Sequence, residues 1–335
     1  MKLNKTTIIA EAGVNHNGKI KNAFKLIDIA KDAGADYVKF QYFNADLTAT
    51  DQVKKATYQL KNFKQKNQSQ KIMLKKLMLN LDQLITIKNY CKKKKIKFLV
   101  SIFDHLNVKN LNKLNLDVIK IASGEITNYP LLKEVAKLKK RVILSTGMCN
   151  EQDIRNALNI FRKFKLNKKK ITLLHCTTNY PVQENEANLL AIQKLKDKFN
   201  LNIGYSDHTV GSEAAIIAIT LGAKIIEKHF TIDKKMKGPD HKASLNPLEL
   251  KEYILKIKKT SKLLGKKIKK ISHNEKKIIR LIRKSIYAKR NIVIGEKFTE
   301  ENIIPKRPFT GISPLRWNDY IGKKAKKNYA KNEKI

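Results

Sequence analysis

The stretch 202–230, NIGYSDHTVGSEAAIIAITLGAKIIEKHF, contains two short apolar runs that end in His208 and His229. Each run predicts a short buried strand with its histidine at the C-terminal end, where parallel α/β proteins build their active sites. Two imidazoles at neighbouring strand ends can share one divalent metal ion. Either histidine taken alone is more often a core residue with backbone partners. The pair matters because polar residues also stand at the other strand ends.

Six further apolar runs precede these two, and amphipathic stretches separate them. The eight predicted strands span 7–13, 36–43, 97–103, 118–124, 141–147, 171–177, 202–208 and 225–230. Continuous apolar runs of this length are typical of strands that are buried on both faces. Strict alternation of strands and helices favours parallel pairing, and eight units favour a closed (β/α)8 TIM barrel, although an open sheet has the same spacing.

Two of the amphipathic stretches, 19–33 and 150–164, predict helices on the outside of this barrel. Asn150 is the expected N-cap of the second helix, with Asp153 at the capping-box position. The connection over 44–69 is long, and long connections of this kind usually belong to the active site of a barrel.

The chain has 335 residues, more than the roughly 250 that one barrel requires. We assign 1–265 to the barrel, because the β-α pattern ends near Gly265, and 266–282 to a lysine-rich linker of weak helical character. In 283–335, short alternating segments between proline and glycine residues predict a small β-rich domain. A domain of about 50 residues is marginal alone, so we expect it to rely on a partner.

The formal net charge of +42 raises the alternative of a lysine-rich nucleic-acid-binding protein. Of the 71 basic residues, however, 63 are lysine and only 8 are arginine, the residue that binds phosphates and guanines in a bidentate manner. The lysines are spread along the whole chain, in stretches between apolar segments. We therefore expect no nucleic-acid partner, and a general attraction for anionic substrates instead.

Three cysteines, at positions 91, 149 and 176, are an odd and widely spaced set. Such a set argues against a disulfide framework and indicates a reducing compartment. No apolar run reaches membrane-spanning length, and residues 1–5 lead directly into a strand-like run rather than a signal peptide. We expect a cytoplasmic protein without a membrane partner.

Charged and polar side chains stand at the predicted strand ends. Lys39 and Lys120 lie inside apolar runs, where an unpaired lysine is costly, so a buried anion is a natural partner for each. Hydroxyl and amide donors are offered at further strand ends by Ser123, Ser145 and Ser206. Together these residues favour a cradle for a phosphate, or for a phosphate and a carboxylate. In the alternative, each lysine pairs with Glu11 or Glu125, and each serine is only a turn residue.

Several short motifs follow one another in a specific order. They are AEAGVNHNG (10–18), KFQ (39–41), KIASGE (120–125), LSTGM (144–148), LHCTTNYP (174–181), YSDHT (205–209), EKHFT (227–231) and GPDH (238–241). In these motifs and their order the chain resembles the N-acetylneuraminate (sialic acid) synthase family over essentially its whole length. KRP at 306–308 and GISP at 311–314 resemble the antifreeze-like (SAF) domain of that family, a label that describes a fold.

The resemblance implies a TIM barrel followed by a SAF domain, in a domain-swapped homodimer. Members of the family are transferases that condense phosphoenolpyruvate with an N-acyl hexosamine such as N-acetylmannosamine. They release phosphate by C–O cleavage and form a nine-carbon 2-keto sugar acid. The family requires a divalent cation, usually Mn²⁺ or Mg²⁺.

Matching positions then imply a role for each site residue. The metal ligands would be His208 and His229, and Arg307 would be the arginine that the SAF domain sends into the partner's active site. The positions that match phosphoenolpyruvate contacts are Lys39, Lys120, Ser123, Ser145 and Ser206. The positions that match residues near the sugar are Glu11, Gln41, Glu125, Tyr180 and Asp240. Glu11 or Glu125 would deprotonate the attacking water or stabilise the developing cation.

Some alternatives stay open within this resemblance. Ile102 stands where many members have threonine, so the threonine hydroxyl contact to the phosphate would be absent. The motifs do not separate N-acetylneuraminate from N,N'-diacetyllegionaminate synthesis, while 13–15 and 39–41 look less like the pseudaminate branch. A barrel that joins phosphoenolpyruvate to a phosphorylated aldose would need a second, arginine-rich phosphate site, and arginine is scarce here.

Overall fold

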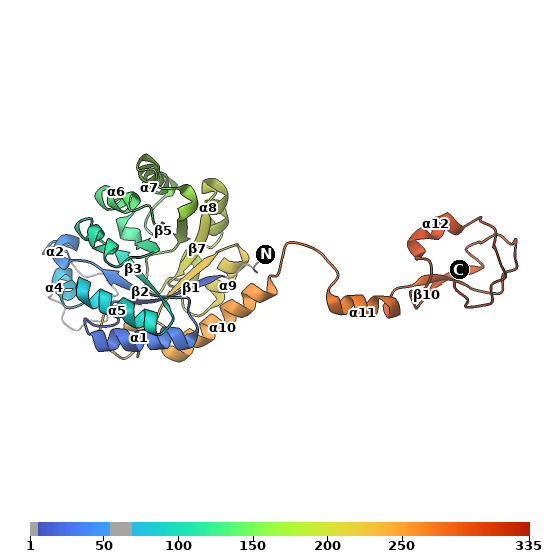
Figure 1. Cartoon of the computed structure of the whole chain (residues 1–335), viewed down its shortest axis with the longest axis horizontal. Coiled ribbons are helices and arrows are strands. Elements are labelled where there is room, and N and C mark those ends of the chain that lie inside the picture. Colours follow the sequence, from blue (N-terminus) through green and yellow to red (C-terminus); the bar gives the residue numbers. More distant parts are fainter. Residues whose placement is uncertain (1–5, 54–68) are drawn as a thin grey trace. The chain divides into compact units, whose positions relative to one another are not determined.

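The computed structural model of the chain describes residues 6–53 and 69–335 (Figure 1). The chain divides into two compact units, Met1–Gly265 and Lys266–Ile335. Of the long connection expected at 44–69, α2 (Ala45–Thr48) lies at the beginning and Ser69 caps α4 (Gln70–Lys75) at the end. Residues 54–68 of that connection lie outside the described residues.

Eight parallel strands in the first unit close into a barrel, because each pairs with the next and β8 pairs with β1. They are β1 (Thr7–Gly13), β2 (Tyr37–Tyr42), β3 (Lys97–Ile102), β4 (Val118–Ile121), β5 (Arg141–Ser145), β6 (Ile171–His175), β7 (Asn202–Asp207) and β8 (Ile225–His229). Every strand lies within one of the eight predicted runs, and the predicted (β/α)8 barrel is confirmed. The fourth run ends early, because 123–125 form a 3₁₀ turn instead of continuing the strand.

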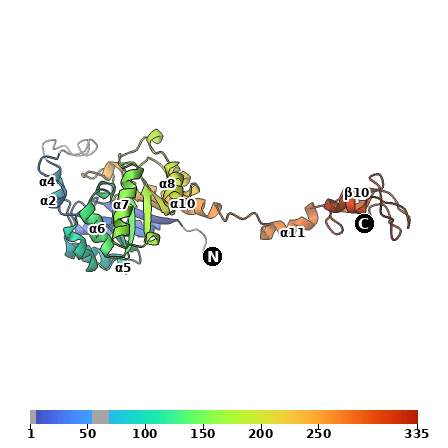
Figure 2. The ribbon, with the colours of Figure 1, turned by 90° about the horizontal axis from the view of Figure 1, so that it is seen from above.

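Helices surround the barrel, as Figures 1 and 2 show for the first unit. Besides α2 and α4 they are α1 (Ile20–Ala33), α5 (Leu81–Lys93), α6 (Tyr129–Lys137), α7 (Glu151–Lys163), α8 (Ala191–Phe199), α9 (Glu213–Thr220) and α10 (Pro247–Leu263). Between β3 and β4 the chain forms the 3₁₀ helix Leu106–Asn112. Helix α7 begins as predicted, since Asn150 and Asp153 form a reciprocal capping box. None of the described helices is both long and apolar enough to span a membrane.

The barrel interior changes from apolar to polar along the strands. An apolar layer fills it near the N-terminal ends of the strands, formed by Ile9, Leu99, Val118, Ile143 and Leu174. Because strand side chains alternate with a period of two, the residues two positions further along also face the interior. Those residues are Glu11, Ser101, Lys120, Ser145 and Cys176. The strands therefore place a ring of polar side chains directly on top of an apolar floor.

The second unit has a small core of its own. It contains α11 (His273–Ile282), the antiparallel pair β9 (Ser285–Ala288) and β10 (Ile303–Lys306), and α12 (Trp317–Tyr320). The core side chains are Ile286, Ala288, Ile292, Phe298, Ile303 and Ala325. Helix α11 occupies the last ten residues of the predicted linker, and Ser272 and Glu275 form its capping box.

Candidate active site

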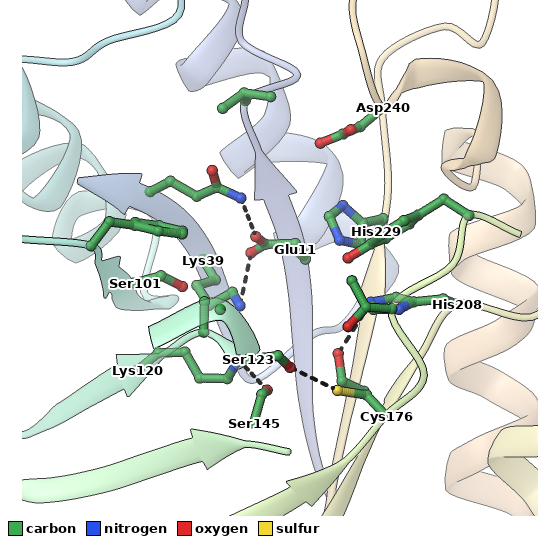
Figure 3. A pocket seen from close by; sticks show the side chains of 18 of the residues that line it. Glu11, Lys39, Ser101, Lys120, Ser123, Ser145, Cys176, His208, His229 and Asp240 are labelled. Atoms are coloured by element: carbon green, nitrogen blue, oxygen red, sulfur yellow. Dashed lines mark hydrogen bonds and ion pairs between the residues drawn. The ribbon is translucent and has the colours of Figure 1, made fainter. Parts of the chain in front are cut away.

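A pocket lies at the C-terminal end of the barrel, above the polar ring (Figure 3). Its wall combines predicted site residues from seven of the eight β-strands, all except β3, or from the segments that follow them. Those in the wall are Glu11, Lys39, Gln41, Lys120, Ser123, Ser145, Tyr180, Ser206, His208, His229 and Asp240. The closed barrel brings these residues together because all its parallel strands end at the same rim.

A cluster of buried charges forms the inner part of the pocket. Lys39 Nζ lies 2.8 Å from Glu227 Oε2 and 3.5 Å from Glu11 Oε2. Lys120 Nζ lies 3.4 Å from Glu227 Oε1 and donates a 2.7 Å hydrogen bond to Ser145 Oγ. Both lysines thus have buried anionic partners within the protein, and Glu227 serves both of them.

The charges in this cluster shift one another's proton affinity. Burial alone would raise the pKa of Glu227, but the ammonium groups of Lys120 and Lys39 hold it well below its usual range. Burial lowers the pKa of Lys120, and Glu227 offsets only part of that effect. Glu227 is therefore ionised near neutral pH and keeps a fixed negative charge between the two lysines.

Glu11 differs from Glu227 in its proton affinity. Burial is the largest influence and raises the pKa of Glu11 to about 7, although nearby Lys39 acts in the opposite direction. Gln41 Nε2 donates a 3.3 Å hydrogen bond to Glu11 Oε1. A carboxyl group with this pKa is present in both protonation states near pH 7, as a general acid or base requires.

The serines join neighbouring strand ends. Ser206 Oγ donates a 2.9 Å hydrogen bond to Glu227 Oε1. Ser123 Oγ accepts a 2.9 Å hydrogen bond from the backbone N–H of Gly147 and lies 3.2 Å from Cys176 Sγ. The protein thus fixes the positions of these hydroxyl groups before an anion enters the pocket.

The two histidines lie side by side across the ends of β7 and β8. Their ring centroids are 5.6 Å apart, and the Tyr180 ring lies 4.2 Å from His208. His208 Nδ1 donates a 2.7 Å hydrogen bond to the carbonyl oxygen of Thr177, which leaves Nε2 with its lone pair. Burial lowers the pKa of His208 to about 4. The pKa of His229 is held well below its usual range, mainly by burial and to a smaller extent by the neighbouring His208.

These imidazoles fit a divalent cation. Both are neutral near pH 7, and His229 Nδ1 is buried without a hydrogen-bond partner among the described residues. An orphaned buried nitrogen beside a second available ring nitrogen is the donor set that Mn²⁺ or another divalent ion accepts. In the described ranges no three His, Cys, Asp or Glu side chains are grouped to hold a metal. Water or substrate oxygens would therefore have to complete the coordination.

Two predicted residues are not part of the pocket wall. The Glu125 carboxylate accepts a 2.7 Å hydrogen bond from Asn128 Nδ2 instead, and burial raises its pKa. Arg307 belongs to the second unit, directly after β10. Asp240 does line the wall, where burial raises its pKa to about 6.

Sequence reasoning missed Glu227, which is the central anion of the cluster. The signal was present, because Glu227 precedes His229 by two positions and must face the same side of β8. The same period identifies Ser101 and Cys176 as further wall residues. Ile102 packs in the core between barrel and helices, and its neighbour Ser101 faces the pocket.

One side of the pocket is apolar. Val14, Met73, Leu74, Leu77 and Phe103 line it and pack together in one cluster. Met73 and Leu74 belong to α4, which follows the long connection after β2. The pocket therefore offers charges at its base and a hydrocarbon surface on one side.

Comparisons with known proteins agree with this geometry. Residues 26–269 match the NeuB family and residues 283–335 match the SAF domain. The N,N'-diacetyllegionaminic acid synthase of Campylobacter jejuni is 51% identical over 99% of both chains. The synthase of the same name from Legionella pneumophila is 42% identical over 96% of this chain and 90% of that protein. The crystal structure of a sialic acid synthetase from Leptospira borgpetersenii in complex with citrate has a TM-score of 0.71 at 35% identity, over 82% of this chain and 90% of that one.

Proposed function

Because the chain belongs to the NeuB family of sialic-acid-type synthases, we propose that it condenses phosphoenolpyruvate with an N,N'-diacetylated 6-deoxyhexosamine. The products would be N,N'-diacetyllegionaminic acid and phosphate. The observation that carries this proposal is the 51% identity, over 99% of both chains, with a synthase of that acid. The pocket chemistry supports each part of the reaction separately.

Phosphoenolpyruvate would bind at the charged base of the pocket. Lys39 and Lys120 offer two ammonium groups that are now partnered by Glu11 and Glu227. An incoming phosphate or carboxylate would compete with these carboxylates for the lysines, and Ser123, Ser145 and Ser206 would supply neutral donors to the same anion. The folded protein has already removed water from the two lysines, so anion binding does not bear the cost of desolvating them.

The reaction forms a C–C bond to the sugar and a C–O bond to water, and it breaks the C–O bond to phosphate. The C2=C3 electron pair of phosphoenolpyruvate attacks the aldehyde carbon of the open-chain sugar, whose oxygen takes up a proton. Water adds to C2 and gives up a proton, and the C2–O bond to phosphate then breaks to leave the 2-keto acid. Orientation and charge stabilisation supply most of the catalysis, since no covalent enzyme intermediate is needed.

Glu11 is the better candidate for the base that receives the proton of water. It lines the pocket, and its pKa of about 7 allows the carboxylate to accept a proton near neutral pH. Glu125 lies outside the wall and is occupied by Asn128. We therefore assign the proton transfer to Glu11 and a supporting role to Glu125.

His208 and His229 would hold a divalent cation, Mn²⁺ or Mg²⁺. When bound, the cation would act as a Lewis acid on the sugar aldehyde oxygen. Gln41, Tyr180 and Asp240 would contact the sugar from the pocket wall. Arg307 would reach the N-acyl end of the sugar from the SAF domain of a partner subunit, in a domain-swapped homodimer.

Two features of the pocket favour a diacetylated 6-deoxy sugar over N-acetylmannosamine or a sugar phosphate. The apolar side formed by Met73, Leu74 and Leu77 suits a C6 methyl group better than a hydroxymethyl group. No arginine lines the pocket in the described part of the chain, although a phosphorylated sugar would need a second anion site. Both features bear on which sugar binds, and neither bears on the binding of phosphoenolpyruvate.

Phosphate release with phosphoenolpyruvate and a panel of hexosamines tests the proposal. We expect the highest kcat/KM with the 2,4-diacetamido-6-deoxyhexose, a lower value with N-acetylmannosamine and none with its 6-phosphate. A preference for N-acetylmannosamine would correct the sugar, and activity with the phosphorylated sugar would refute the reasoning about arginine. Absence of phosphate release with every sugar, in the presence of Mn²⁺, would refute the function.

A further inference from the structure

A second buried charge pair lies immediately behind the two histidines. Asp207 is the last residue of β7 and directly precedes His208, and Lys228 directly precedes His229 on β8. Because strand side chains alternate, these two residues face the helices while the histidines face the pocket. Lys228 Nζ lies 3.0 Å from Asp207 Oδ2, and the two side chains are only 3% and 0% exposed. The two residues are also paired across the sheet, so this ion pair joins β7 directly to β8.

Helix α10 adds a third member to this pair. Tyr253 OH donates a 2.7 Å hydrogen bond to Asp207 Oδ2, and Lys228 Nζ lies 5.3 Å from the centroid of the Tyr253 ring. The other oxygen, Asp207 Oδ1, accepts from the backbone N–H and the hydroxyl of Thr209 at 2.9 and 2.7 Å. Lys228 Nζ also donates to the carbonyl oxygen of Thr209. The carboxylate and the ammonium are thus fully engaged with each other and with their surroundings.

The network holds the backbone at the points that carry the histidines. Asp207 and Thr209 flank His208, and Lys228 directly precedes His229. A buried ion pair adds little to stability that apolar packing could not supply, and in some proteins it fixes the geometry of the groups that it joins. The hydrogen bond to Thr177 separately fixes the ring of His208. The two rings whose backbone the network flanks stand 5.6 Å apart between centroids.

We propose that Asp207, Lys228 and Tyr253 are positioning residues that hold His208 and His229 at the separation a shared divalent cation requires. This inference rests on the proposed function, which places a cation on the two histidines. None of the three residues lines the pocket, so they act on the cation only through the histidines. The affinity for the cation is then set partly by a tyrosine on the last helix of the barrel.

Binding of Mn²⁺ to the full chain, without substrates, tests this proposal. Electron paramagnetic resonance measures the concentration of unbound Mn²⁺. Tyr253→Phe removes the hydroxyl and keeps the ring that packs on Lys228. Its matched control is Tyr90→Phe, because Tyr90 OH also donates to a carboxylate, that of Asp28, within the same barrel. We expect Tyr253→Phe to raise the Kd for Mn²⁺ by about tenfold, as for other residues that orient metal ligands, and Tyr90→Phe to leave it unchanged.

A second variant and a second ligand separate positioning from general loosening. Asp207→Asn keeps the shape of the side chain but removes the counter-charge of Lys228, and should weaken Mn²⁺ binding further. Phosphoenolpyruvate affinity, measured by calorimetry without metal, should be unchanged in Tyr253→Phe. Wild-type Mn²⁺ affinity in Tyr253→Phe and Asp207→Asn, or an equal loss of phosphoenolpyruvate affinity, would overturn the positioning role. If the unsubstituted protein binds no Mn²⁺, the proposed metal site itself fails, and the positioning role falls with it.

Discussion

Glu227 shows how a single side chain organises the base of the pocket. Its carboxylate contacts both Lys39 and Lys120 and also accepts a hydrogen bond from Ser206. Without it, two buried ammonium groups would repel each other and would have to lose protons or move apart. Glu227 therefore favours the charged form of both lysines and holds them close together, which prepares them for an anionic substrate.

Lys120→Met should raise the KM for phosphoenolpyruvate much more than the KM for the sugar. A hydrogen bond to a charged group contributes about 1.5–3 kcal/mol, so the expected increase is about 10- to 100-fold. The measurement is steady-state phosphate release with each substrate varied in turn. Lys94→Met is the control, because the Lys94 ammonium pairs with Asp28 at the surface. An equal or larger effect on the sugar would show that Lys120 serves the other substrate.

Glu11 determines the expected pH dependence. A base must be ionised, and the pKa of Glu11 is raised to about 7, so kcat/KM should fall as the pH decreases through that value. Glu11→Gln should reduce kcat strongly and abolish this acidic decline in the remaining activity. Glu125→Gln is the matched control and should keep the decline. If the decline disappears in Glu125→Gln and persists in Glu11→Gln, the two glutamates have the opposite roles.

At the scale of elements, the turn after β5 holds the loop after β4 in place. The backbone N–H of Gly147 donates to Ser123 Oγ at 2.9 Å. A Cβ atom at Gly147 would lie 2.9 Å from Ser123 Oγ and would collide with Thr178 Oγ1. Only glycine therefore lets the loops after β4, β5 and β6 approach each other this closely.

Gly147→Ala should displace Ser123 and raise the KM for phosphoenolpyruvate several-fold. This increase corresponds to the loss of about one hydrogen bond in binding free energy. Gly124→Ala is the control within the neighbouring loop, since a Cβ atom there meets nothing within 4 Å. Thermal unfolding of both variants checks that the barrel is intact. Unchanged phosphoenolpyruvate kinetics in Gly147→Ala would mean that Ser123 does not contact this substrate.

The elements also show how far the sequence alone leads. All eight strands were predictable, because a strand that is buried on both faces leaves a continuous apolar run. Their ends were less certain: 123–125 continue a polar motif but turn out of the sheet, which removes Glu125 from the pocket wall. Glu227 escaped notice because a charged residue within an apolar run gives no sign of its partners, which lie on β2 and β4. The network of Asp207, Lys228 and Tyr253 depends on the docking of α10, which no local pattern specifies.

At the scale of the whole molecule, the helix that precedes the SAF domain bears on the proposed role of Arg307. Helix α11, which precedes that domain, exposes apolar side chains, among them Ile278, Leu281 and Ile282. Such a surface on one helix is typical of a contact with another chain. In the proposed dimer, each SAF domain would serve the barrel of its partner.

Mixing two inactive variants tests this exchange. Arg307→Ala retains an intact barrel, and His229→Ala retains an intact SAF domain. If the site is shared across subunits, mixed dimers should recover part of the activity, up to about one site in each mixed dimer. Subunit exchange is followed by mass spectrometry of differently tagged chains. Demonstrated exchange without any recovery of activity would exclude a domain-swapped site.

The most direct test of the proposed reaction uses phosphoenolpyruvate labelled with ¹⁸O in the oxygen that bridges C2 and phosphorus. The account predicts that phosphate is released only when the sugar is present, that this phosphate carries the label, and that one nine-carbon 2-keto acid forms per phosphate. Mass spectrometry of both products, in parallel reactions with and without the sugar, measures all three quantities. Release of phosphate without the sugar, or a label retained in the keto acid, would contradict the condensation.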